Sequence, residues 1–202
     1  MSVWVIGAGG HAKVVIATLQ AAGETVAGVL DDDAARHGTV VLGVPVVGPV
    51  ARAAEGEHEA IVAVGDNRAR QRIVRSLPGV TWATAVHPSA VVHPSVQIGT
   101  GSVVFAGAVI QPDTHIGNHT ILNTGATVDH DGVIDDYVHL APGTHLAGNV
   151  RLGEGVFFGI GAVAVPGVTV GAWTTVGAGA TVIADLPAHV TAVGVPARPR
   201  SS

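Results

Sequence analysis

Cysteine is absent from this chain of 202 residues. A chain without cysteine has neither a disulfide framework nor a thiol nucleophile. Positive charge is also scarce, because ten Lys and Arg stand against fifteen Asp and Glu, for a formal net charge of −5. The few basic residues are not clustered, which excludes the basic surface that nucleic-acid binding requires. The length allows one or two domains.

Long apolar runs are missing as well, although 48% of the residues are hydrophobic. No uninterrupted apolar run reaches the length of a transmembrane helix, so we expect no membrane insertion. The first ten residues enter a buried-strand pattern without the basic segment and cleavage site of a signal peptide. We therefore expect a cytoplasmic protein.

A six-residue repeat occupies the chain from residue 86 to residue 182. In steps of six it places a large apolar residue everywhere except at Ala164, and the residue two before it is small or β-branched. These positions are Val86, Val92, Ile98, Val104, Ile110, Ile116, Leu122, Val128, Ile134, Leu140, Leu146, Leu152, Phe158, Ala164, Val170, Val176 and Val182. A helical period of 3.6 fits none of this segment. An unbroken hexad of this kind predicts a solenoid of stacked coils.

The hexads group in threes, because Ile-Gly, Ile-Asp, Leu-Gly or Val-Gly pairs recur every eighteen residues. Three hexads then form one triangular coil of three short parallel strands, and the segment is predicted to be a left-handed parallel β-helix of about five coils. Glycine, asparagine and aspartate often follow the apolar position, and we expect positive φ angles at these residues. They are Gly99, Gly117, Asn123, Asp129, Gly153, Gly171 and Gly177.

The first eighty residues have a different pattern, in which apolar strands alternate with helical segments. Strands are predicted over residues 3–6, 25–30 and 60–64, and helices from the end of the turn at Ala12 to Ala22 and over residues 68–77. Alternation of this kind indicates a small parallel, Rossmann-like α/β sheet. We predict two domains: residues 1–85, a small Rossmann-like nucleotide-sugar-binding domain, and residues 86–202, a β-helical acyltransferase domain with a short C-terminal tail.

A glycine-rich turn follows the first predicted strand and matches G-x-G-x-x-A at Gly7, Gly9 and Ala12. Amides at such a helix start can hold a phosphate, and the acidic group 31–33 stands where ribose recognition is expected. Roughly 80 residues supply only one mononucleotide half, which argues against a dinucleotide-dependent dehydrogenase. A nucleotide attached to another group fits better, and a merely structural turn remains the alternative.

Seven of the eleven histidines lie in the repeat: His87, His93, His115, His119, His130, His139 and His145. No two of them are separated by eighteen or thirty-six residues, which argues against a stacked metal site within one chain. His130 differs because Asp129 and Asp131 flank it. A neutral imidazole has a pKa close to neutrality and can accept a proton from an amine or hydroxyl. A neighbouring carboxylate orients such a base.

The segment from Asn123 to Asp131, with His139 and 147–150, resembles the nucleotide-sugar and sialic-acid acetyltransferase family, which includes bacterial acetyltransferases of UDP-4-amino-4,6-dideoxy sugars. The resemblance also covers 7–12, 31–33, 65–68 and 193–197. It implies an acetyl-CoA-dependent transfer to the amine of a nucleotide-linked amino sugar of the UDP-4-amino-4,6-dideoxy type, by direct attack on the thioester. It also implies a homotrimer whose active sites lie between subunits, and no metal is expected.

The same resemblance implies roles for individual residues. His130 would be the general base and Asp131 its orienting partner, with Asp129 as the alternative. The nucleotide sugar would be bound by Gly9, Gly10, His11, Asp31, Asp32, Asp66 and Arg68. Acetyl-CoA would contact Asn123, His139, Gly148, Ile160 and Ala178.

Other functions stay open at this point. O-acetylation of a sialic acid or related sugar would use the same base and acyl donor. A non-catalytic β-helical binding module would treat His130 as an ordinary corner residue. The sequence leaves open the nucleotide, the sugar, the acyl group and the pathway, whether capsule, lipopolysaccharide or protein glycan.

Overall fold

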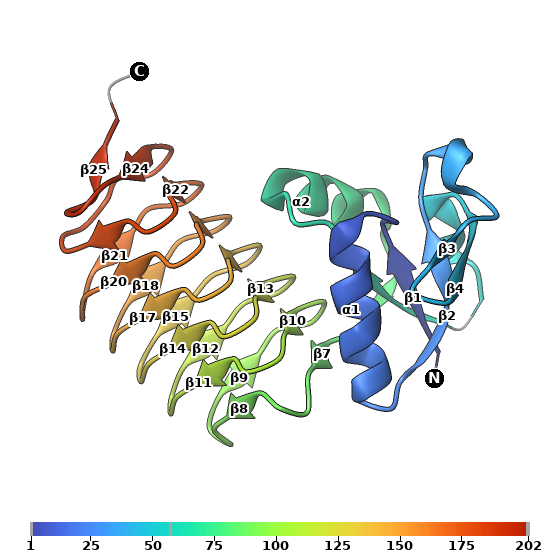
Figure 1. The fold of residues 1–202 in the computed structure, drawn as a ribbon, viewed down its shortest axis with the longest axis horizontal. Helices are drawn as coiled ribbons and strands as arrows, with labels where there is room; N and C mark the ends of the chain where they lie inside the picture. The colour runs from blue at the N-terminus through green and yellow to red at the C-terminus, as the bar shows by residue number, and fades with distance from the viewer. Residues whose placement is uncertain (1, 57, 201–202) are drawn as a thin grey trace.

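A computed structural model describes residues 2–56 and 58–200 and shows two parts side by side, a small α/β unit and a tapering stack of coils (Figure 1). The α/β unit contains a six-stranded sheet in the order β3-β4-β2-β1-β5-β6. All its neighbours pair in parallel except the β3–β4 hairpin. Its elements are β1 (Ser2–Ile6), α1 (Gly10–Ala21), β2 (Thr25–Leu30), β3 (Val40–Val41), β4 (Val44–Gly48), β5 (Glu59–Val62), α2 (Asn67–Ser76) and β6 (Thr81–Trp82), with 3₁₀ turns at Ala34–Arg36 and Val50–Ala54.

Every predicted element of the α/β unit is present, within two residues of its expected ends at most positions. The sequence analysis missed β3, β4 and β6, because β3 and β6 are only two residues long and β4 contains a proline and ends in a glycine. Runs that short carry no measurable period.

The coils form a left-handed parallel β-helix, as predicted. Each apolar hexad position from Val86 to Val182 is the second residue of a two-residue strand. Each strand pairs with the strand eighteen residues away, as in Ile121 with His139. The first face holds β7 (Ala85–Val86), β10 (Val103–Val104), β13 (Ile121–Leu122), β16 (His139–Leu140), β19 (Phe157–Phe158), β22 (Thr175–Val176), β24 (Thr191–Val193) and β25 (Arg198–Pro199). The second holds β8 (Val91–Val92), β11 (Val109–Ile110), β14 (Thr127–Val128), β17 (His145–Leu146), β20 (Val163–Ala164) and β23 (Thr181–Val182). The third holds β9 (Gln97–Ile98), β12 (His115–Ile116), β15 (Val133–Ile134), β18 (Arg151–Leu152) and β21 (Thr169–Val170).

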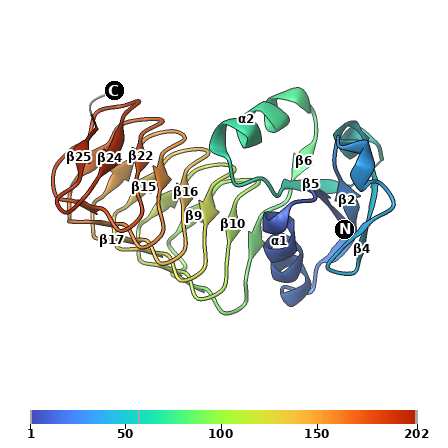
Figure 2. The same ribbon diagram turned by 45° about the horizontal axis from the view of Figure 1, so that its top comes forward.

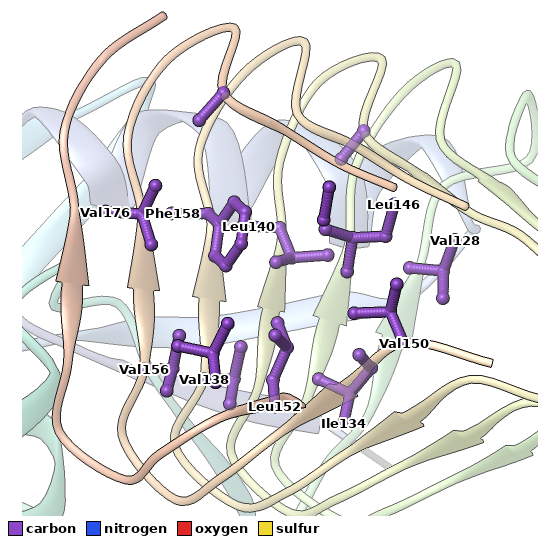
Figure 3. Packing of buried hydrophobic residues seen from close by; sticks show 14 of the residues in the cluster. Val128, Ile134, Val138, Leu140, Leu146, Val150, Leu152, Val156, Phe158 and Val176 are labelled. Atoms are coloured by element: carbon purple, nitrogen blue, oxygen red, sulfur yellow. The ribbon is translucent and has the colours of Figure 1, made fainter. Parts of the chain in front are cut away.

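The hexad side chains fill the inside of the β-helix, where they stack from coil to coil (Figure 3). Leu140 and Phe158 are fully buried, and so are the small partners two residues earlier, Val138 and Val156. Full burial of one such large apolar side chain contributes roughly 1.5–3 kcal/mol. The row of inward side chains therefore supplies the core that a stack of two-residue strands needs.

The positive φ angles lie elsewhere than predicted. From Ile98 to Val176 they occur at the third residue after each inward side chain, for example at Asp131 (φ 58°) and Asn149 (φ 61°), and not at the first. The prediction was wrong for Gly99, Gly117, Asn123, Asp129, Gly153, Gly171 and Gly177.

Glycine follows many inward side chains for another reason: the next coil of the β-helix approaches too closely for a side chain to fit. A Cβ placed on Gly117 would lie 2.6 Å from the backbone carbon of Asp135 and the backbone nitrogen of Asp136. A Cβ on Gly99 would lie 2.6 Å from the backbone nitrogen of Asn118. Glycine is therefore required there by packing between coils and not by backbone conformation.

One hydrophobic cluster joins the two parts of the molecule. It combines Val15 and Leu19 of α1 with Val103, Phe105 and Ile121 of the first face. Figure 2 shows α1 beside the first coils of the β-helix. The hydrogen bonds of α2 to His119, Tyr137 and Gly155 place it over the corner between the third and first faces. The chain passes from β6 to β7 within two residues. The division into domains at residue 85 stays a prediction. Within the described residues, no helix is long and apolar enough to cross a membrane.

Two glycine substitutions should separate packing from conformation. We expect Gly117→Ala to lower the free energy of unfolding by about 1–3 kcal/mol, because the new Cβ meets backbone that has no room to move. Gly167 has φ 76° and open space around its Cα, and it lies one coil above Asn149. We expect Gly167→Asn to change the free energy by less than about 0.5 kcal/mol. Denaturant unfolding of both proteins measures this, and equal stability of Gly117→Ala and wild type would contradict it.

Candidate active site

The glycine-rich turn between β1 and α1 opens onto a cavity. Gly7 adopts φ 104°, which suits only glycine at low cost. Gly9 precedes α1, and no side chain within the described residues caps the helix start. Nothing lies within 4 Å of a Cβ built on Gly9 or Gly10. The start of α1 is thus an uncapped helix terminus with space for an anion.

Acidic residues beyond β2 hold this turn in place. Asp31 accepts a hydrogen bond from the backbone N–H of Ala8 at 2.7 Å, and Arg36 donates to the Ala8 carbonyl at 2.7 Å. The cavity of about 400 Å³ is lined by Gly7–His11, Asp31, Asp33, Arg36 and Ala63–Gly65. Asp32 instead accepts from the Val50 N–H and does not line the cavity. Of the predicted nucleotide-sugar ligands, the structure thus brings together Gly9, Gly10, His11 and Asp31.

Asp66 and Arg68 line a second cavity, which shares Gly65 with the first. Asp66 caps α2 by accepting from the Ala69 N–H. The Arg68 guanidinium lies 4.2 Å from the centre of the Trp173 ring, a cation–π contact that links α2 to the β-helix.

His139 projects from the first face beneath the glycine turn, and its hydrogen bonds fix its tautomer. Asn123 Oδ1 accepts from the Thr124 N–H, so its Nδ2 is the group that faces His139 Nε2, at 3.2 Å. Nε2 must therefore be the unprotonated acceptor, and Nδ1 donates to the Gly65 carbonyl at 3.1 Å.

Burial keeps His139 and its neighbour His11 neutral. Burial lowers the pKa of His139 to about 3. The hydrogen bond to Gly65 opposes this, and the charge of Arg70 and the proximity of His11 add smaller lowering effects. Burial and Arg70 lower the pKa of His11 to about 4. Neither imidazole carries a proton on both nitrogens near neutral pH.

His130 lies in the opposite environment, at an exposed corner between the second and third faces. Its Nδ1 is 2.8 Å from Asp131 Oδ2, and the two side chains are 55% and 53% exposed. The hydrogen bond to Asp131 raises the pKa of His130, and the charge of Asp129 adds to this. Asp129 Oδ1 accepts from the backbone N–H of His130 and not from its ring. In the structure, Asp131 and not Asp129 therefore hydrogen-bonds the imidazole.

Gly148, one coil above His130, leaves the space that the His130 imidazole occupies. A Cβ on Gly148 would lie 2.6 Å from both Nε2 and Cε1 of His130. The ring therefore packs against the next coil, with Nδ1 on Asp131 and the side chain 55% exposed. An imidazole that is oriented on one side and open to solvent can act as a general base.

The two halves of the predicted site lie on different edges of one chain. Asn123 follows β13, at the corner between the first and second faces, and Ile160 and Ala178 are exposed at the same corner on later coils. His130 and Gly148 occupy the corner between the second and third faces. Within the described residues, no group of three His, Asp or Glu side chains could hold a metal ion.

Sequence reasoning missed Arg36, Arg70 and Trp173, which line the cavities or surround His139. Trp173 sits at a β-helix corner with φ 58°. The repeat predicts a corner there, but nothing in it predicts that α2 lies above.

The comparisons with known proteins agree with this geometry. The family model described as PglD N-terminal domain matches residues 2–77. A mutant of perosamine N-acetyltransferase from Caulobacter crescentus, crystallised with CoA and GDP-perosamine, is 48% identical, with a TM-score of 0.95 over 100% of this chain and 98% of that one. The acetyltransferase domain of PglB from Neisseria gonorrhoeae is 41% identical, with a TM-score of 0.92 over 98% and 99%. WeeI from Acinetobacter baumannii is 28% identical, with a TM-score of 0.89 over 99% and 100%.

Among curated proteins, an uncharacterized protein of Acanthamoeba polyphaga mimivirus is 33% identical over 103 residues. The match covers 50% of this chain and 21% of that protein, so the chain spans about a fifth of its length.

The fold and these likenesses define the chain as an acyltransferase of the hexapeptide-repeat class. Within that class it belongs to the nucleotide-sugar acetyltransferases. The PglB domain has been crystallised with acetyl coenzyme A.

The His130–Asp131 contact predicts a measurable titration shift. We expect Asp131→Asn to lower the pKa of His130 toward its ordinary value, because the variant loses both the charge and the accepting carboxylate. Asp129→Asn, the matched control on the other side of His130, should lower it less. NMR titration of the His130 ring in the three proteins checks this, and equal shifts in both variants would contradict the pairing.

Proposed function

We propose that this protein transfers the acetyl group of acetyl-CoA to the amine of a nucleotide-linked amino sugar, with His130 as the general base. The observation that carries the assignment is the His130–Asp131 pair packed on Gly148, with the His130 side chain 55% exposed. The cavity over Gly9 and Gly10 supplies a place for the diphosphate of the substrate.

The reaction needs no covalent enzyme intermediate. The amine nitrogen attacks the thioester carbonyl while Nε2 of His130 accepts its proton, and Asp131 stabilises the imidazolium that forms. The carbon–sulfur bond then breaks, the amide remains on the sugar, and the CoA thiolate takes up the proton. The rigid coils contribute by holding the acyl group and the base in one geometry.

The identity of the nucleotide and the sugar is a second, more specific part of the proposal. The family resemblance implies a UDP-4-amino-4,6-dideoxy sugar, and this stays a prediction. The 48% identity to a perosamine N-acetyltransferase crystallised with GDP-perosamine favours a GDP sugar as the alternative. O-acetylation of a sialic acid has no comparable support.

The separation of the two halves of the site supports a homotrimer with active sites between subunits. His130 of one chain would then face Asn123 and His139 of its neighbour. Exposed apolar side chains on and beside the second face, among them Val91 and Ile160 at 63% exposure each, would be covered in such an assembly. Cytoplasmic location stays a prediction.

Turnover assays test the chemistry. We expect release of CoA from acetyl-CoA with a GDP- or UDP-linked 4-amino sugar and not with free sialic acid. His130→Ala should lower kcat about 10²- to 10⁴-fold, the usual contribution of a positioned base. Gly148→Ala should also lower kcat, because the new Cβ displaces the imidazole.

The control is Gly167→Asn, at the same kind of corner one coil above Asn149, which should keep wild-type turnover. Full activity of His130→Ala would contradict its assignment as base. Acetylation of sialic acid alone would contradict the substrate class.

Mixed assemblies test the shared site. His130→Ala and His139→Ala proteins should each be inactive, and co-expression of the two should restore about a quarter of wild-type activity, because random assortment in a cyclic trimer leaves that share of sites with both intact histidines. No recovery in a mixed assembly verified by mass would contradict a site made by two subunits.

A further inference from the structure

Arg70 on α2 is a fully buried arginine that faces no carboxylate at hydrogen-bond distance within the described residues. Its side chain is 1% exposed. A buried charge is costly unless its donors are satisfied. Burial lowers the pKa of Arg70 to about 10, and Asp66 and Tyr137 oppose this lowering. Arg70 therefore stays charged near neutral pH.

Backbone oxygens from both parts of the molecule surround this guanidinium. Nε donates to the His119 carbonyl at 2.8 Å, and Nη2 donates to the Tyr137 carbonyl at 2.8 Å. These two residues lie at the same corner on successive coils. Nη2 also donates to Asn67 Oδ1 at 2.8 Å. The planar group thus ties α2 to two coils of the β-helix at once.

The remaining nitrogen of Arg70 reaches the strand end beside the candidate active site. Nη1 donates to the Val64 carbonyl at 3.0 Å and to the Gly65 carbonyl at 3.4 Å. The Gly65 carbonyl is the acceptor of His139 Nδ1, and Gly65 also lines both cavities. One oxygen therefore links the buried cation to the imidazole.

We infer that Arg70 is a positioning residue of the active site: its guanidinium holds the Gly65 carbonyl against His139 and so keeps His139 as the Nδ1–H tautomer, with Nε2 as a hydrogen-bond acceptor. Its effect on turnover rests on the proposed function, and its effect on the imidazole does not.

The surroundings of His139 agree with this role. The groups packed against it are His11 on α1, Arg70 on α2, Asn123 at the neighbouring corner and Phe157 on the next coil. Of these, Arg70 is the charged one, and a cation disfavours a second proton on the imidazole. Removing Arg70 removes its hold on the Gly65 carbonyl, which leaves His139 free to change tautomer, while burial, the largest cause of its lowered pKa, remains.

The direct test is ¹⁵N NMR of the histidine side chains between pH 5 and pH 8, with the His139 signals identified from their absence in His139→Gln. In the wild type we expect a protonated Nδ1 and an unprotonated Nε2 throughout the range. In Arg70→Met we expect mixed tautomers. Arg75→Met, an exposed arginine of the same helix, should match the wild type.

A folded Arg70→Met protein in which His139 keeps its single, non-titrating tautomer would overturn the inference. If Arg70→Met does not fold, Arg70→Lys is the variant to test, because an ammonium retains the charge without spanning the carbonyls of Gly65 and Tyr137. An unchanged His139 tautomer in Arg70→Lys would overturn the inference. A wild-type His139 that titrates in this range would also overturn it.

Turnover provides the second readout. We expect Arg70→Met to lower kcat by about 10- to 100-fold, as for other misplaced active-site groups, with a smaller change in KM for acetyl-CoA and none in Arg75→Met. An Arg70→Met protein that keeps the wild-type kcat although His139 has lost its single Nδ1–H tautomer would overturn the positioning role of Arg70 in the active site. If the wild type acetylates no nucleotide sugar, the proposed function fails, and the histidine spectra still decide the inference.

Discussion

The eighteen-residue ladder between coils is the constraint on which the rest of the molecule depends. Each strand is only two residues long, so no strand has enough hydrogen bonds to persist alone. Stability comes from repeating the same pairing up the stack while aliphatic side chains fill the interior. An insertion would shift every later residue to another face, because position on the triangle is set by counting along the chain.

The eighteen-residue repeat also sets the position of the candidate catalytic residues. Gly148 lies one coil above His130, and the missing Cβ at Gly148 is what lets the imidazole lie against the stack. Asp131 takes a left-handed conformation at the corner, from which its carboxylate reaches Nδ1 of its neighbour in sequence. The hydrogen bond itself joins neighbours in sequence, and its exposed position suits a base that must meet a substrate bound by other parts of the molecule.

Two kinds of histidine result from two environments. His130 is exposed and its carboxylate partner raises its pKa, whereas His11 and His139 are buried near the cation Arg70 and have strongly lowered pKa values. The first can take up a proton during a reaction, while the others are fixed hydrogen-bonding groups. Arg70 contributes to this difference while its donors join α2 to the β-helix, so docking of the two parts and the state of the buried imidazoles depend on the same side chain.

The sequence alone determined the β-helix, since a hexad of inward side chains is a local pattern that any reader of the chain can count. It also determined that carboxylates flank His130, because the residues are adjacent, and the glycine turn before α1, because its signal lies within six residues. The structure decided that Asp131 and not Asp129 hydrogen-bonds the imidazole. Only the tertiary structure decided that a glycine such as Gly117 is required by the close approach of the neighbouring coil and not by its own φ angle. That coil lies eighteen residues away in the sequence. The tertiary structure likewise decided the roles of Arg70 and Gly65, whose partners come from separate coils and follow from how α2 docks, a long-range packing that no local pattern encodes.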